Sequence, residues 1–301
     1  MDATVARAPR ALTAASAFPL LVLGAAAMGI SPLFVRDAGV GPFASAFWRV
    51  GLALPVLAIW AQASRGSASQ PWRRIWRNRA LHLAGILFAG DLICWHLAVL
   101  NTSIANATFF ACLAPIWVAL LSRFTIGESV SPRTFAGLAI CLPGAALLIL
   151  HSRGDAISHP VGDLLGLGTS FFFGLYFLAI RSARRVAGGA EATLVSSAVS
   201  TVILLIVALA AGDSLIPQTW QAAANLTALG LVSHAAGQGL LAVALGVLSA
   251  SFSSLVILIE AVIAALAAWI FAGEPLSLLQ IAGGLMVMAG LLVARPRGGK
   301  A

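Results

Sequence analysis

From Val256 to Ser277 the chain reads VILIEAVIAALAAWIFAGEPLS, an apolar run that holds one acidic residue, Glu260, and ends in a Gly-Glu-Pro turn. A run of about 20 apolar residues is long enough to cross a bilayer as a helix. Its apolar residues do not alternate with period two, as the strands of a membrane barrel would. The stretch therefore predicts a membrane-spanning helix with a carboxyl group inside it.

The rest of the chain has the same character. Of its 301 residues, 60% are apolar and only 9% are charged, and the mean hydropathy is +0.98. Soluble domains are about half apolar and about a quarter charged. A soluble fold of this composition would lack the polar residues that cover a surface, whereas a bilayer accepts it. We expect an all-α integral membrane protein with no soluble domain of any size.

Polar breaks divide the apolar sequence into ten expected transmembrane helices of roughly 20 residues each. The expected spans are residues 14–36, 41–63, 80–100, 103–123, 133–151, 161–180, 191–211, 221–243, 247–271 and 275–294. Two of the connections, at Asn101-Thr102 and Leu245-Gly246, contain almost no polar sequence. The first run continues to Val35, which favours an uncleaved first helix over a signal peptide.

The basic residues indicate how these helices are oriented. With a cytoplasmic N-terminus, 15 of the 18 basic residues fall on the cytoplasmic side, only Arg36 and Arg153 fall outside, and Arg49 lies within a span. Such a bias is the usual topology signal of membrane proteins. It predicts a multi-pass protein of the cell inner (plasma) membrane with both termini in the cytoplasm.

The chain repeats itself at an offset of 146 residues. The matching segments are Gly127-Glu128-Ser129-Val130-Ser131 with Gly273-Glu274-Pro275-Leu276-Ser277, Ala136-Gly137 with Ala282-Gly283, and Gly144 with Gly290. The offset pairs spans three to five with spans eight to ten, so the expected repeats are residues 14–151 and 161–294. Because each holds an odd number of spans, the second must enter the membrane upside down. Inverted repeats are typical of secondary transporters, which alternate access around a central site.

With these features the chain resembles the EamA-type transporters of the drug/metabolite transporter superfamily. The likeness covers about residues 14–294 and is most specific at the Gly-Glu turns. Segments Leu113–Ile116 and Ile259–Val262 resemble the family's Ser/Glu-Pro-Val segment, although Ala261 stands where the proline is usual, so the residues do not themselves require a kink there. The resemblance implies secondary transport, often export, of amino acids, their analogues, other metabolites or drugs.

Arg49 and Asp91 are charged groups inside spans, each nine residues from the outer end of its helix. Charges within the bilayer are costly and usually functional. At equal depth on consecutive antiparallel helices the two side chains are expected to meet. Two interpretations stay open: a stabilising ion pair inside the bundle, or a site at which Arg49 binds a substrate carboxylate and Asp91 its amine.

Five further residues complete the candidate site. His234 and Glu260 lie near the middle of their spans, where a carboxyl and an imidazole are suited to carry a proton. A core role is the alternative interpretation for both. Asn106 and Gln238 are candidate hydrogen-bond donors to a substrate, with bonding between helices as the alternative. Tyr176 is an aromatic candidate for the cavity wall.

The sequence also bears on functions other than transport of metabolites and drugs. The sequence contains no H-E-x-x-H or G-x-S-x-G motif, so we expect no catalytic residues, no metal site, no cofactor and no enzymatic activity. Transport of phosphorylated metabolites, such as sugar nucleotides or triose phosphates, is the main alternative, yet it requires several cavity cations. Arg49 is the only arginine in the interior of an expected span, and Lys300 is the only lysine. A channel or an intramembrane enzyme explains the inverted repeat less directly.

The expected partners are a small-molecule substrate and the lipid bilayer, not nucleic acid, and the oligomeric state stays open.

Overall fold

A computed structural model describes residues 12–66, 69–102, 104–150, 160–272 and 276–295, and all the regular structure in this part of the chain is helical. The first half contains α1 (Ala14–Gly29), α2 (Ser31–Arg36), α3 (Pro42–Gly51), α4 (Leu54–Ala63), α5 (Trp72–Trp76), α6 (Arg79–Asn101), α7 (Ile104–Ala111), α8 (Ala114–Thr125) and α9 (Pro132–Leu150). The second half contains α10 (Pro160–Ala183), α11 (Gly189–Ala210), α12 (Trp220–Ala228), the π-helix η1 (Leu229–Gln238), α13 (Gly239–Ala244), α14 (Ala250–Val256), α15 (Ile259–Ala272) and α16 (Leu278–Ala294).

Within the described residues, seven helical segments are long and apolar enough to cross a membrane. They are Ala14–Val35, Pro42–Ala63, Arg79–Ala98, Pro160–Ala183, Gly189–Ala210, Trp220–Ala244 and Ala250–Ala267. The other three expected spans correspond to shorter apolar helices, Phe109–Thr125, Pro132–Leu148 and Leu278–Ala294. The first of these contains the break at Cys112-Leu113, and the second begins at a proline. The chain is thus a multi-pass helical membrane protein.

Two helices in the middle of the bundle are broken at corresponding places. The first break separates α7 from α8 at Cys112-Leu113, where Leu113 N–H donates to the Phe110 carbonyl at 3.0 Å. The second separates α14 from α15 at Ile257-Leu258. There Glu260 N–H donates to the Ile257 carbonyl at 2.8 Å, three residues back. This tighter turn interrupts the regular α-helical ladder. Although Ala261 replaces the usual proline, the second helix is therefore interrupted as the first one is.

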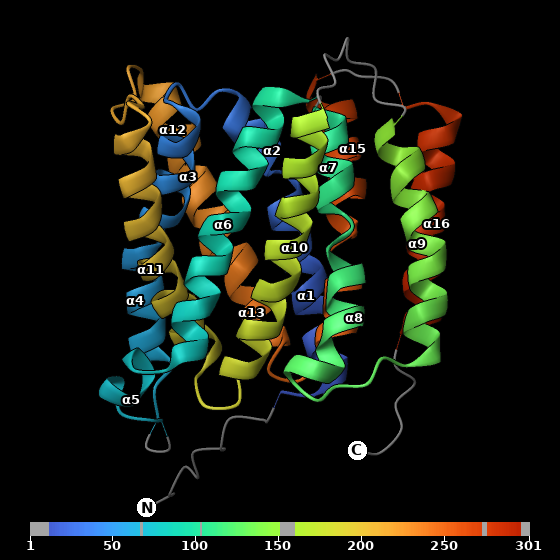
Figure 1. Ribbon diagram of the computed structural model, residues 1–301, viewed down its shortest axis with the longest axis horizontal. Coiled ribbons are helices and arrows are strands. Elements are labelled where there is room, and N and C mark those ends of the chain that lie inside the picture. The colour runs from blue at the N-terminus through green and yellow to red at the C-terminus, as the bar shows by residue number, and fades with distance from the viewer. Residues whose placement is uncertain (1–11, 67–68, 103, 151–159, 273–275, 296–301) are drawn as a thin grey trace, which may run out of the picture.

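The close contacts between the two halves follow the 146-residue offset of the sequence repeat. α9 and α16 lie side by side at one edge of the bundle and run in opposite directions (Figure 1). Gly137 lies against the Gly290 carbonyl, and Gly283 lies in the same way against the Gly144 carbonyl. A shift of 146 residues converts one contact into the other. Likewise, Gly29 lies against the carbonyl of Glu260. Glycines at these positions let helix backbones approach closely.

The α9–α16 contact supplies a test with an internal control. A Cβ atom at Gly283 would lie 2.5 Å from the Gly144 carbonyl oxygen, whereas one at Gly284 would meet nothing closer than 3.9 Å. We therefore expect Gly283→Ala to cost about 1–3 kcal/mol of stability through overpacking. Gly284→Ala should be neutral or stabilising, because alanine costs less chain entropy in a helix. Thermal unfolding of the two purified variants in detergent measures this difference. Equal melting temperatures would contradict the close contact.

A polar cluster joins the two halves at the end of the bundle where α5 lies. Glu128, in the loop between α8 and α9, forms an ion pair with Arg181 of α10 at 2.5 Å. Its other carboxylate oxygen accepts the backbone N–H of Ala250, the first residue of α14, at 3.0 Å. Arg181 also donates to the Leu245 carbonyl at 2.7 Å. Glu128 thus caps a helix of the other half, while Glu274, its counterpart in sequence, lies outside the described residues.

Candidate functional site

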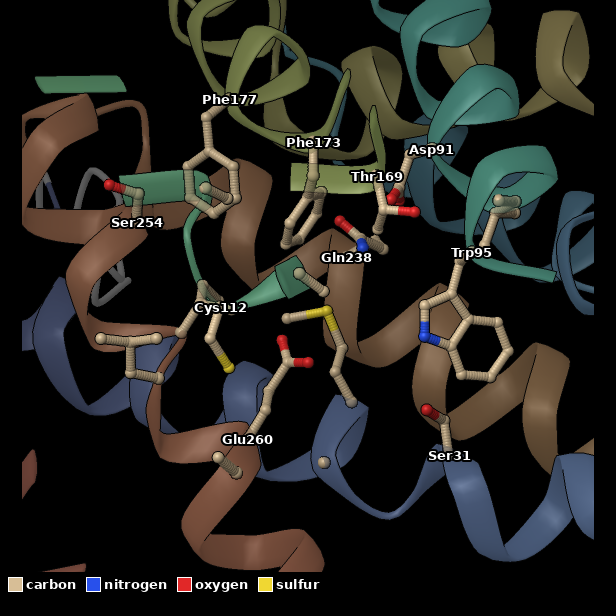
Figure 2. A pocket seen from close by; sticks show the side chains of 18 of the residues that line it. Ser31, Asp91, Trp95, Cys112, Thr169, Phe173, Phe177, Gln238, Ser254 and Glu260 are labelled. Carbon is tan, nitrogen blue, oxygen red and sulfur yellow. The ribbon is translucent and has the colours of Figure 1, made fainter. Parts of the chain in front are cut away.

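A cavity lies between the two broken helices. Its wall is formed by α1, α2, α3, α6, α7, α8, α10, η1, α14 and α15, together with the breaks themselves. Figure 2 shows polar side chains from opposite walls, Asp91 on one side and Glu260 on the other, with Gln238 between them. Four residues predicted from the sequence line this cavity: Arg49, Asp91, Gln238 and Glu260. A largely apolar wall with a few polar groups facing inward is typical of small-molecule sites.

Arg49 and Asp91 face the same cavity, but the ion pair expected from the sequence does not form. The ion pairs within 4.0 Å among the described residues are Arg65–Glu191 and Arg181–Glu128. The Arg49 Nε atom is buried and has no hydrogen-bond partner. α3 and α6 belong to consecutive spans but touch each other at few positions, and α11 of the second half packs more extensively against each of them. Both charges are thus available to a third group in the cavity.

Glu260 lies in the first turn of α15, directly after the second helix break. Its Oε1 atom is buried and accepts or donates no hydrogen bond within the described structure. The first turn of a helix favours a negative group through the helix dipole. The carboxyl group of Glu260 therefore has an environment in which it can be charged or neutral, depending on what else occupies the cavity.

Gln238 and Tyr176 are joined by a hydrogen bond between their side chains. The Tyr176 hydroxyl donates to the Gln238 side-chain oxygen at 3.2 Å, and both residues are about 1% exposed. Tyr176 does not line the cavity itself; it lies behind Gln238, with its ring 5.0 Å from the ring of Phe88. By holding the amide oxygen, Tyr176 leaves the amide N–H groups of Gln238 for the cavity.

His234 lies outside the cavity wall. Its Nε2 atom shares a 2.7 Å hydrogen bond with the Ser197 hydroxyl, and its ring packs 5.2 Å from the ring of Phe88. Its Nδ1 atom is buried without a partner. Phe88 thus separates His234 from the cavity that it lines. Asn106 belongs to α7, but its side chain lies outside the described part of the chain.

The structure adds residues that the sequence did not single out. Thr169, Phe173 and Phe177 of α10 line the cavity, as do Ser31 and Cys112 (Figure 2). Of these, Thr169 is 2% exposed and its hydroxyl has no hydrogen-bond partner. A lone threonine in an apolar helix carries no sequence signal, because most such hydroxyls bond to their own helix. Only the position of α10 in the bundle identifies it.

The cavity combines one positive group with two carboxyls and aromatic walls, an arrangement that can bind a small amphiphile through both ends. No group of three His, Cys, Asp or Glu side chains suited to a metal ion occurs in the part of the chain that is described. The cavity can bind charged groups at Arg49, Asp91 and Glu260, exchange a proton at the two carboxyls, and form hydrogen bonds through Gln238 and Thr169.

Comparison with known proteins identifies relatives of this chain and a solved structure with the same fold. The chain is 30% identical over 220 residues to the pseudopaline exporter CntI of Pseudomonas aeruginosa, a match that covers 73% of this chain and 76% of the relative. It is 26% identical over 274 residues to an uncharacterized transporter of Archaeoglobus fulgidus, covering 91% and 94% of the two chains. One crystal structure, titled only as that of a protein, shares the fold with a TM-score of 0.76 at 18% identity, over 94% of this chain and 98% of the other.

Comparison with a protein-family model assigns the chain to a family. The sequence model of the EamA-like transporter family matches twice, at residues 15–150 and at residues 160–295. The two matches together cover nearly the whole chain, including every element that lines the cavity. The chain belongs to the EamA-like transporter family.

Proposed function

We propose that this protein is a secondary active transporter that exports small amine-bearing metabolites, such as amino acids, their analogues or cationic drugs. The observation that supports this most directly is the cavity beside two broken helices, which holds Arg49, Asp91 and Glu260 without an ion pair between them. Discontinuous helices at the middle of the membrane are where transporters bind substrate and coupling ions. The name of the Pseudomonas relative, an exporter, supports the outward direction.

The charge of the cavity argues for the substrate class. One guanidinium and two carboxyls favour a zwitterionic or weakly cationic substrate, with Arg49 binding a carboxylate and Asp91 an amine. Gln238, oriented by Tyr176, supplies further hydrogen bonds, and Asn106 is a candidate from α7. A phosphorylated substrate would need several cations to neutralise it, and Arg49 is the one basic residue among those that line the cavity.

The architecture we propose is two inverted repeats of five spans each, residues 14–151 and 161–294, with ten spans in all. The reciprocal glycine contacts and the twofold family match support it. Alternating access then follows from movement of one repeat against the other around the cavity. A rotation axis along the membrane normal, found in an experimental structure, would contradict this architecture.

Topology can be tested with fusions of a reporter that is active only in the cytoplasm of the host cell. We expect activity after Arg79, Arg133, Arg185 and Lys300, because basic residues mark the cytoplasmic loops of an inner-membrane protein. Fusions after Arg153 or Asp213 should be inactive, because each lies on the outer side in the ten-span arrangement. An active fusion at Arg153 would contradict both the span number and the cytoplasmic placement of the termini.

The transport function itself is tested by growth protection. Cells that express the protein should resist toxic amino-acid analogues or amphiphilic amines, and purified protein in proteoliposomes should then move the compound found by this screen. An Arg49→Met, Asp91→Leu double variant, which removes one positive and one negative group from the cavity, is the inactive control for the site. Equal resistance in cells with the native protein and with this variant would contradict transport through the cavity.

A further inference from the structure

We infer that Asp91, Thr169 and Gln238 form a subsite for a primary ammonium group that has a hydrogen-bond acceptor beside it. The inference rests on the proposed transport function and names the part of the substrate that this end of the cavity recognises. All three side chains line the cavity, from α6, α10 and η1, and Figure 2 draws them close together in its view.

The Thr169 hydroxyl is the first indication. Threonines within helices usually donate to the carbonyl one turn earlier, and in this chain Thr125, Thr193 and Thr201 do so at 2.8, 2.9 and 2.8 Å. Thr169 does not, and its oxygen is buried without a partner at the cavity wall. An unsatisfied buried hydroxyl is costly, so a ligand or water must provide its hydrogen bond.

Asp91 supplies the charge. The residue is 7% exposed and lines the cavity, and within the described structure it forms no ion pair within 4.0 Å and no hydrogen bond. A buried carboxylate needs a cation or several donors to offset its lost hydration. Since Arg49 forms no ion pair with it within 4.0 Å, a positive group brought in by the ligand is the partner that fits.

Asp91 and Thr169 together favour a primary ammonium group over a quaternary one. A primary ammonium group has N–H bonds enough for both Asp91 and Thr169, while its positive charge is also attracted by aromatic faces such as those of Phe88 and Trp95, which line the same cavity. A quaternary ammonium group keeps the charge but has no N–H to donate. The hydroxyl of Thr169 therefore discriminates between the two groups, whereas Asp91 attracts both.

Gln238 completes the subsite through its orientation. Because Tyr176 donates to the amide oxygen at 3.2 Å, the amide nitrogen is left to donate to an acceptor of the ligand. A carboxyl or carbonyl oxygen next to the ammonium group meets this requirement, as in the head group of an amino acid or its amide. Tyr176 is then a positioning residue that acts through Gln238.

Binding to the purified protein in detergent tests the subsite independently of transport. The probes are L-phenylalanine amide, a primary amine with an adjacent carbonyl, and its N,N,N-trimethyl derivative, and calorimetry or tryptophan fluorescence gives each Kd. We expect Thr169→Val to weaken binding of the primary amine by about tenfold, the size of one hydrogen bond to a charged group. Binding of the trimethyl derivative should change by less than about threefold. Thr169→Ser should retain native binding.

The control is Thr201→Val, which removes an equally sized hydroxyl that already bonds to the Ser197 carbonyl at 2.8 Å, away from the cavity. It should alter neither Kd. Asp91→Asn and Tyr176→Phe should each weaken binding of both probes, because both probes carry a positive charge and an adjacent carbonyl. Equal losses for both probes in Thr169→Val, or no binding of either probe to the native protein, would overturn the subsite. Retained pH-gradient-driven transport in that case would leave the proposed function standing.

Discussion

Proteoliposomes that contain the Glu260→Gln variant should show no accumulation of substrate when a pH gradient is imposed, whereas the native protein should concentrate it. Glu260 lies beside a helix break at the cavity, and its Oε1 atom has no hydrogen-bond partner. A carboxyl in such a place can take up a proton when substrate leaves and release it when substrate binds. Glutamine keeps the shape of the side chain but carries no titrating proton. Gradient-driven transport should therefore fall to the background level of empty vesicles.

Two further measurements separate proton coupling from substrate binding. Exchange of labelled for unlabelled substrate needs no net proton movement, so Glu260→Gln should still exchange substrate at equal pH on both sides. Glu260→Asp, which keeps a titratable group, should retain part of the gradient response, and gel filtration should show both variants folded. Unchanged gradient dependence in Glu260→Gln would rule out the coupling role, and loss of exchange as well would assign Glu260 to substrate binding.

The second large effect is expected from the cluster that joins the halves at the α5 end of the bundle. Glu128 and Arg181 are paired at 2.5 Å with side chains only 17% and 22% exposed. Removing one partner leaves the other charge mostly buried, so Glu128→Gln and Arg181→Gln should each lower the free energy of unfolding by about 2–3 kcal/mol. The double variant should cost less than the sum of the two, with a coupling energy of about 1–3 kcal/mol.

Unfolding in mixed micelles with increasing denaturing detergent measures these energies. The glutamine at position 128 can still accept the N–H of Ala250, so the cycle isolates the charge pair from the helix cap. Arg133→Gln is the control, because Arg133 is exposed and has no described partner, and it should change stability by less than about 0.5 kcal/mol. Additive losses in the cycle would show that Glu128 and Arg181 do not support each other.

Much of the fold follows from local sequence. Helices that must satisfy their backbone inside lipid are recognised by long apolar runs, and the structure contains a helix at each expected span, although three of these helices are short. The family was recognisable from the Gly-Glu turns and the offset of 146 residues, and the twofold match to the EamA-like transporter family confirms it. Arg49, Asp91 and Glu260 drew attention because charges inside a bilayer are costly.

What only the tertiary structure decided is which side chains meet. Depth along a span placed Arg49 opposite Asp91, but depth does not say which helices are neighbours, and α11 packs against both α3 and α6. The break before Glu260 occurs without a proline, at the point where Gly29 packs against the Glu260 carbonyl. Thr169 is an ordinary helical threonine in the sequence and becomes a candidate ligand only through its place in the cavity wall. Hydrophobicity fixes how a helix lies in the membrane, whereas packing between distant segments determines what faces the cavity.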